Sequence, residues 1–325
     1  MKNNITLYGC GGTGVNIVTP YILNPQKDRD GYATITPSLI DTSESNISDD
    51  RVKKVFYKIK LEKNAEGSGS VRSENVDEIR QQVPTFISEY KPGDLSIVVA
   101  SANGGSGSTI APVLVSELVK RQHPVITVLL VDDNNQKSIE NAQRTLVSFD
   151  TMAKKSGVPF VAALVPNVTL ASANNLAGET IAYLSMLFSN ENHGLDNADL
   201  RNFLNFTKVT QVQPGLAGLL IADKLTEDYN RNPISLAMLH TTPEAQQASR
   251  GKFVTGYSCE GIFRTDAEVK DKTVYFTIEY DDVLDVMNHL ADKAESYNTT
   301  LSGVLNRTIK LKDEKASIDD DGLVL

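Results

Sequence analysis

Short apolar runs separated by helical patterns fill the first half of the chain. Three of these runs, residues 95–100, 125–131 and 158–165, are apolar almost throughout, which is typical of parallel strands covered on both faces. Their alternation with helical segments indicates βα units and a largely parallel sheet. The strands expected in this half are residues 5–8, 34–40, 95–100, 125–131 and 158–165.

The hydrophobic pattern changes in the second half. Residues 171–188 are predicted to form a helix whose apolar positions nearly encircle its last turns, so we expect it to be buried between two domains. Two β-rich runs, residues 256–264 and 273–280, and an amphipathic helix over about residues 282–295 predict a smaller second α/β domain. The expected units are a first domain at 1–170, a central helix at 171–190, a second domain at 191–311 and a tail at 312–325.

Composition limits the classes of partner. A chain of 325 residues that is 40% hydrophobic and 22% charged suits two packed domains. Its formal net charge of −9 argues against direct binding to nucleic acid or to an anionic membrane, because phosphate contacts need clustered Lys and Arg. We find no signal segment and no run near the roughly 20 apolar residues of a membrane span, so a cytoplasmic protein is expected. Cys10 and Cys259 lack metal-ligand spacing, which argues against a disulfide framework or a zinc site.

Two glycine-rich segments each follow a predicted strand and precede a predicted helix. The first matches G-x-G-x-x-G through Gly9, Gly11 and Gly14, and the second runs over residues 101–109. Glycine lets backbone amides approach phosphate oxygens, and a helix N-terminus adds partial positive charge. The second segment lacks the lysine of a P-loop, so helix dipoles, amides and a metal ion would balance the phosphate charge. Two such segments predict a ring of backbone donors around a polyphosphate, although the first alone could be a tight structural turn.

An NAD-dependent dehydrogenase is one alternative. It would use the first glycine loop for a pyrophosphate and Asp41, at the end of a predicted strand, for the ribose. The Asp41 carboxylate could equally hold a hydrated Mg²⁺ near phosphates. A dehydrogenase of the usual type needs one glycine loop rather than two, and no catalytic constellation is evident. The histidines are scattered, at His123, His193, His240 and His289.

The glycine loops resemble those of the tubulin/FtsZ superfamily. Residues 103–109, Asn-Gly-Gly-Ser-Gly-Ser-Thr, are similar to the G-G-G-T-G-[ST]-G signature, and residues 11–14 with Asn16 resemble the first phosphate loop. Asn103, Ser106 and Thr109 depart from the signature. Asparagine tolerates positive φ and serine keeps the hydroxyl, so we expect nucleotide binding to be retained.

The resemblance extends over most of the chain and is closest to the phage-encoded tubulins of the PhuZ group. Those chains are similarly short and end in an acidic segment followed by small apolar residues, as residues 319–325 do here. The resemblance implies an α/β, tubulin/FtsZ-like fold: a parallel-sheet GTP-binding domain, a central buried helix, a smaller C-terminal domain and an acidic tail. It also implies a GTPase whose filaments position phage DNA in the infected bacterium, with the tail docking on a neighbouring subunit. A solvated, disordered tail is the alternative.

The resemblance further implies that GTP or GDP, with Mg²⁺, lies across the carboxyl ends of the strands. Residues of the two loops would hold the phosphates: Gly11, Gly12, Thr13, Gly14, Asn16, Asn103, Gly104, Gly105, Ser106, Gly107 and Ser108. Asp41, Gly67, Ser68 and Gly69 would flank the β- and γ-phosphates and Mg²⁺, while Glu140, Asn141 and Arg144 would lie near the ribose.

The resemblance assigns the guanine base to Asn174 and Asn175, because an amide can pair with both the donors and the acceptor of guanine. Considered without the family, this asparagine pair near a helix start is more typical of a helix cap.

Asp196 and Asp199 carry the catalytic prediction. Locally they read as a helix N-cap and a first-turn acid. Residues 196–199 also resemble the FtsZ motif N-x-D-F-A-D, which implies a catalytic loop on the face opposite the nucleotide, serving the next subunit of a head-to-tail filament. Carboxylates spaced i, i+3 lie on one side of a helix, so both could orient the water that attacks the γ-phosphate. A scaffold that binds nucleotide without hydrolysing it is the remaining alternative.

Overall fold

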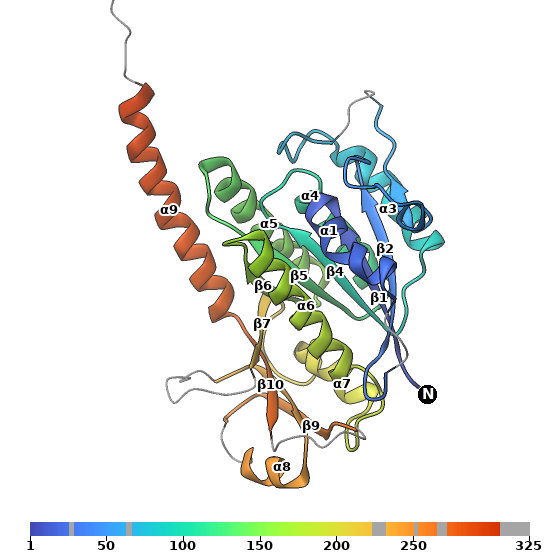
Figure 1. Ribbon diagram of the computed structural model, residues 1–325. Helices are drawn as coiled ribbons and strands as arrows, with labels where there is room; N and C mark the ends of the chain where they lie inside the picture. Colours follow the sequence, from blue (N-terminus) through green and yellow to red (C-terminus); the bar gives the residue numbers. More distant parts are fainter. Residues whose placement is uncertain (26–28, 63–66, 223–231, 250–252, 265–271, 306–325) are drawn as a thin grey trace, which may run out of the picture.

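A computed structural model describes residues 1–25, 29–62, 67–222, 232–249, 253–264 and 272–305 (Figure 1). The predicted tail at 312–325 lies outside the described residues. The expected α/β fold is confirmed, whereas the predicted domain boundaries stay a prediction. Among the described helices, none combines the length and the hydropathy that crossing a bilayer requires.

The described strands form one ten-stranded, mostly parallel sheet. Their order across the sheet is β3 (Phe56–Lys58), β2 (Thr34–Asp41), β1 (Asn4–Cys10), β4 (Leu95–Ser101), β5 (Val125–Val131), β6 (Phe160–Pro166), β7 (Leu216–Ala222), β10 (Thr273–Glu279), β8 (Ser235–His240) and β9 (Tyr257–Ile262). Strand β10 runs antiparallel to β7 and β8. Because β6 pairs in parallel with β7, the predicted second β-rich region continues the first sheet.

Helices cover both faces of the sheet, and alternate strand residues feed two hydrophobic cores. One core lies under α1 (Gly11–Leu23), α2 (Asp50–Lys53), α6 (Leu170–Leu187) and α7 (Asn197–Leu204). The other lies under α3 (Val76–Glu89), α4 (Gly107–Lys120), α5 (Gln136–Ser156) and α9 (Asp281–Leu305). Helix α8 (Pro243–Ser249) and the short 3-10 turn Phe206–Lys208 complete the described elements.

Two strands of the second half, β7 and β8, were not predicted. Their sequences, LAGLLIA and SLAMLH, are rich in Leu, Ala and Met rather than in β-branched residues, so strand propensity is weak. Strand β10 lies between β7 and β8 and pairs with both. This pairing stabilises two strands that the local sequence favours only weakly.

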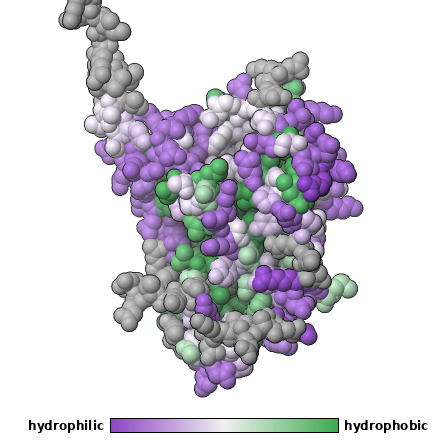
Figure 2. Space-filling view, viewed as in Figure 1, coloured by the Kyte–Doolittle hydropathy of each residue, from purple (hydrophilic) through white to green (hydrophobic). Residues whose placement is uncertain are grey.

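Helix α6 is less buried than predicted. Its last turns pack into the core through Ile181, Leu184 and Leu187. Its first half leaves Leu170 64% exposed and Leu176 41% exposed, and the preceding Val168 is 80% exposed. Hydrophobic surface therefore interrupts the mostly hydrophilic face seen in Figure 2.

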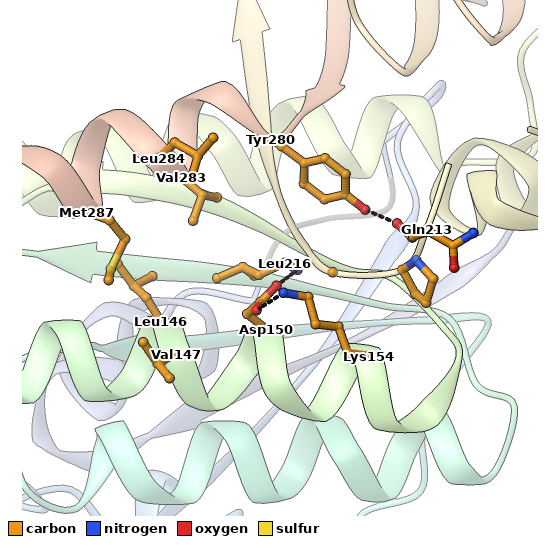
Figure 3. A pocket seen from close by; sticks show the side chains of 12 residues that line it. Leu146, Val147, Asp150, Lys154, Gln213, Leu216, Tyr280, Val283, Leu284 and Met287 are labelled. Carbon is orange, nitrogen blue, oxygen red and sulfur yellow. Dashed lines mark hydrogen bonds and ion pairs between the residues drawn. The ribbon is translucent and has the colours of Figure 1, made fainter. Parts of the chain in front are cut away.

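Helix α9 runs ten residues further than the predicted end at 295 and leaves the body of the protein (Figure 1). The side chains of this extension that face the body reach the β5–α5 connection, where the Tyr297 hydroxyl donates to the Asn134 carbonyl at 3.0 Å. The start of α9 packs over α5 and β7 around an apolar cavity of about 430 Å³, in which Tyr280 donates to the Gln213 carbonyl (Figure 3). The extension is rich in Ser, Asn and Thr, which have low helix propensity, so tertiary contacts stabilise the helix there.

Candidate nucleotide site

The two glycine loops touch each other at the carboxyl ends of neighbouring strands β1 and β4. Gly11 has φ +68°, and a Cβ there would lie 2.5 Å from the Gly107 backbone nitrogen. A Cβ at Gly107 would in turn lie 2.9 Å from the Cys10 carbonyl oxygen. Glycine is therefore required at both positions by backbone-to-backbone packing, and at Gly11 also by its left-handed conformation.

A cavity of about 230 Å³ lies at this junction. Its lining residues are Cys10, Gly11, Gly12, Thr13, Ser68, Gly69, Ser101, Gly104, Gly105, Ser106 and Gly107. Three segments far apart in the sequence thus meet as predicted, and the N-terminus of α4 begins at the cavity. Backbone amides and a helix dipole at one small cavity suit an anion.

Several predicted phosphate residues do not line the cavity in the described part of the chain: Gly14, Asn16, Gly67, Asn103 and Ser108. Gly14 instead allows α1 to approach β4, because a Cβ there would lie 2.3 Å from the Val99 carbonyl oxygen. Asn16 is exposed on α1. The Ser108 hydroxyl donates to the carbonyls of Gly104 and Gly105, which braces the signature loop from within.

Asn103 does not adopt the positive φ that its place in the signature suggested. Its side-chain amide donates to the Asp132 carbonyl at 2.7 Å and the Ser138 carbonyl at 3.0 Å, and its Oδ1 accepts from the Asp132 amide at 2.9 Å. Asn103 therefore links the signature loop to the β5–α5 connection through its side-chain amide. The prediction considered only its tolerance of positive φ and did not include this role.

A cluster of hydroxyls lies beside Asp41. The Thr42 and Ser106 hydroxyl oxygens are 2.7 Å apart, and those of Ser68 and Ser106 are 3.2 Å apart. Asp41 is 4% exposed and accepts from the Thr42 amide at 2.7 Å, yet burial raises the pKa of its carboxyl to about 6. A cation arriving here would favour the ionised carboxylate. The sequence analysis missed Thr42, although a hydroxyl directly after Asp41 at the carboxyl end of a parallel strand was an available signal.

The predicted ribose residues differ in accessibility. Asn141 is completely buried, and its amide donates to the carbonyls of Ser70 and Asn103 at 2.9 Å each, so it fastens the residues after Gly69 to the signature loop. Glu140 and Arg144 lie one turn apart on α5 with side chains 36% and 61% exposed and charges 4.0 Å apart. These two remain accessible to a sugar, whereas Asn141 supports the site from behind.

Asn174 and Asn175 are not helix caps. Thr169 caps α6, accepting from the Ser172 amide at 3.2 Å in a reciprocal capping box. Asn174 Oδ1 is buried and finds no hydrogen-bond partner among the described residues, while Asn175 is exposed. A buried amide oxygen without a donor is unfavourable, and the assignment of Asn174 and Asn175 to the base stays a prediction.

Asp196 and Asp199 form the start of α7. Asp196 Oδ1 accepts from the amides of Ala198 at 2.7 Å and Asp199 at 2.9 Å, and Asp199 Oδ2 accepts from the Asp196 amide at 3.2 Å. The backbone bonds from Asp199 and Ala198 lower the pKa of the Asp196 carboxyl. The local prediction of a cap and a first-turn acid is confirmed. Asp196 is exposed and Asp199 is half-buried.

Helix α7 lies near the N-terminus of the chain, where β1 begins (Figure 1). Asn197 exchanges side-chain hydrogen bonds of 2.8 and 3.3 Å with Asn3, just before β1 begins. The glycine cavity lies at the other end of β1, which has 7 residues and so spans about 20 Å at ~3.3 Å per residue. The two acids therefore cannot reach the cavity of their own subunit.

Comparison with known proteins agrees with this geometry. The GTPase-domain model of the tubulin/FtsZ family matches residues 4–172. A phage tubulin-like protein of Pseudomonas phage PhiPA3 is 29% identical, over 100% of this chain and 99% of its own length. One of Pseudomonas phage phiKZ is 26% identical, over 97% of each chain.

Solved structures give the same result. A protofilament of TubZ from bacteriophage PhiKZ superposes with a TM-score of 0.84 at 25% identity, covering 99% of both chains. The phage tubulin PhuZ bound to GDP shares the fold with a TM-score of 0.83 at 24% identity, over 99% of both chains. The dehydrogenase alternative is not supported, since the matched GTPase domain contains both glycine loops. Because that match spans more than half of the chain, the protein belongs to the tubulin/FtsZ family.

Proposed function

We propose that this protein is a GTPase that polymerises head to tail and hydrolyses GTP at the junction between two subunits. The observation that carries the proposal is the separation of two incomplete half-sites. The glycine cavity offers anion-binding backbone, and α7 offers two carboxylates at the amino-terminal end of β1, the other end of that strand. Stacking one copy on the next brings the half-sites together, and a heterologous contact of this kind repeats into an open filament.

In the proposed complex the amides of Gly11, Gly12 and the signature loop hold the phosphates, and the α4 dipole favours their negative charge. Asn174 pairs with the base, supported by its partnerless buried oxygen. Asp41 and the hydroxyls of Thr42 and Ser106 suit Mg²⁺, a cation that prefers oxygen ligands and bound waters. When bound, Mg²⁺ would neutralise charge on the phosphate oxygens.

Hydrolysis then needs a positioned water. Asp199 and Asp196 of the next subunit accept its hydrogen bonds and aim its oxygen in line with the γ-phosphorus. The oxygen–phosphorus bond to the β-phosphate breaks, leaving GDP and inorganic phosphate, while the loop amides stabilise the developing charge. Release of phosphate removes contacts at the subunit junction, so GTP favours growth and GDP favours disassembly.

Exposed apolar side chains support self-association. Val168 and Leu170 directly follow the carboxyl end of β6, and Leu176 lies further along α6. All three are exposed, and exposed apolar surface commonly marks a protein contact. The related PhiKZ protein was solved as a protofilament. We further propose that the filaments act in the cytoplasm of a phage-infected bacterium and position phage DNA there.

Light scattering after nucleotide addition tests the proposal. We expect GTP with Mg²⁺ to raise scattering within minutes and GDP to leave it at baseline. Gentle purification should also retain a guanine nucleotide. An equal response to GTP and GDP, or retention of NAD, would contradict the proposal.

The acidic tail is proposed to bind a neighbouring subunit, because α9 carries the chain away from its own body (Figure 1). Removing residues 318–325 should raise the critical concentration for assembly about tenfold, which corresponds to ~1.4 kcal/mol of lost contact, and leave GTP binding by the monomer unchanged. Sedimentation across a protein dilution series measures this. Replacing Asp319, Asp320 and Asp321 with asparagine would separate the contribution of charge from that of the apolar end. An unchanged critical concentration for the truncated chain would contradict tail docking and favour a solvated, disordered tail.

A further inference from the structure

Tyr257 reaches the catalytic helix from a strand that is distant in sequence. Tyr257 is the first residue of β9, which is one of the two edge strands of the sheet. Its hydroxyl donates to Asp199 Oδ1 at 3.3 Å and lies 3.4 Å from the Asp199 carbonyl oxygen. The side chain of Asn202, three residues after Asp199 on α7, lies near enough to this hydroxyl to oppose the rise in the pKa of the Tyr257 phenol. The hydroxyl thus lies beside two residues on one face of α7.

The Asp199 carboxylate is therefore held from two sides. Oδ1 accepts from Tyr257, and Oδ2 accepts from the Asp196 amide at 3.2 Å. The last torsion of an aspartate is otherwise broad, so two donors on different oxygens restrict its rotation. A carboxylate has about four lone-pair positions, which leaves room to accept from a water. Asp199 also lines a cavity of about 430 Å³ with Gly194 and Glu260, so its side chain is not enclosed by its own subunit.

The Tyr257 hydroxyl has the properties of a hydrogen-bond donor that is held in one position. Its ring packs against the hydrophobic core, which anchors the hydroxyl. Burial is the main cause that raises the pKa of its phenol to about 12, so the group stays protonated at neutral pH. Both hydroxyl distances are long for O–H···O bonds, and catalytic hydrogen bonds commonly tighten only in the assembled complex.

We propose that Tyr257 is a positioning residue for GTP hydrolysis: it orients the Asp199 carboxylate toward the water at the neighbouring subunit's nucleotide. Tyr257 does not touch the substrate and acts through Asp199. The inference rests on the proposed function, since it requires Asp199 to act at the junction.

Tyr257→Phe tests the proposal, because it removes the hydroxyl and keeps the ring. The hydrolysis rate per polymerised subunit should fall about tenfold, the scale of a modest misplacement of a catalytic group. GTP affinity of the monomer, and the critical concentration with a slowly hydrolysed GTP analogue, should stay within about twofold, because the altered contact is internal to the subunit. Tyr280→Phe is the matched control. It removes another hydrogen-bonded tyrosine hydroxyl, at the α9 side of the sheet, and should leave hydrolysis unchanged (Figure 3).

A double-mutant cycle separates positioning from general stability. In an Asp199→Ala background, Tyr257→Phe should lower the rate no further, because the group it orients is gone. A similar drop in both backgrounds would overturn the proposal, as would an unchanged rate for Tyr257→Phe alone. If Asp199→Ala itself leaves hydrolysis unchanged, the proposed function has failed rather than this inference alone.

Asn202→Ala provides a second route if the phenylalanine variant does not fold. It removes the other α7 side chain that acts on the hydroxyl and keeps the tyrosine. The rate should fall about threefold in the wild-type background and not at all in the Asp199→Ala background, as expected for coupled residues. No change in the wild-type background would overturn the proposal.

Discussion

Replacing Asp199 with alanine is expected to slow GTP hydrolysis in filaments by about a hundredfold, the scale of losing one group that stabilises or positions the transition state. GTP binding should be unaffected, because α7 lies where β1 begins and the glycine cavity lies where β1 ends. Filaments should then persist after assembly, since the γ-phosphate remains in place. Phosphate release, filament lifetime and nucleotide affinity measured on the same preparation check the three parts of this prediction.

Asp199→Asn is the matched control for the capping role of this residue. Asparagine keeps an oxygen that can accept from Asp196 or Tyr257, so α7 should stay intact while the charge is lost. A rate as low as that of the alanine variant would assign the effect to charge. Loss of nucleotide binding in either variant would show that α7 acts on its own subunit, and an unchanged rate would show that Asp199 takes no part in hydrolysis.

Gly11→Ala should weaken nucleotide binding at least about a hundredfold. Alanine in the left-handed region costs roughly 1–2 kcal/mol, and its Cβ would also lie 2.5 Å from the Gly107 backbone nitrogen. Backbone cannot move aside as a flexible side chain can, so the two loops must separate and the cavity between them changes shape. Titration with a fluorescent GTP analogue measures the loss.

Gly157→Ala separates the effect of the clash from that of backbone strain. Gly157 ends α5 with φ +70°, and a Cβ there would meet nothing within 4 Å. This variant should lose roughly 1 kcal/mol of stability and keep its full affinity for GTP. Equal affinity of the Gly11→Ala variant and the wild-type protein for GTP would show that the two loops do not form the phosphate site.

The parallel half of the fold was readable from the sequence because its strands are buried on both faces. Strands β4 and β5 are nearly unbroken apolar runs, a pattern that few other elements produce. Strands β7 and β8 could not be predicted in this way, because Leu, Ala and Met also suit helices and the pairing with β6, β10 and β9 decides their conformation.

The part of the candidate site that consists of glycine loops could be predicted from the sequence, because those backbone positions require glycine. Gly11 and Gly107 are required by backbone contacts, and the loops meet as the motifs indicated. Side chains that work through tertiary partners were not readable. Asn103 binds the β5–α5 connection, and Asn141 fastens a third segment to the signature loop. Such roles depend on which loops become neighbours, which no local pattern contains.

The rate of GTP hydrolysis as a function of protein concentration tests the head-to-tail site most directly, with polymer mass measured by sedimentation in the same samples. A site completed by the next subunit predicts almost no hydrolysis below the critical concentration and a rate proportional to polymer mass above it. A rate proportional to total protein at every concentration, with no polymer in the pellet, would contradict it.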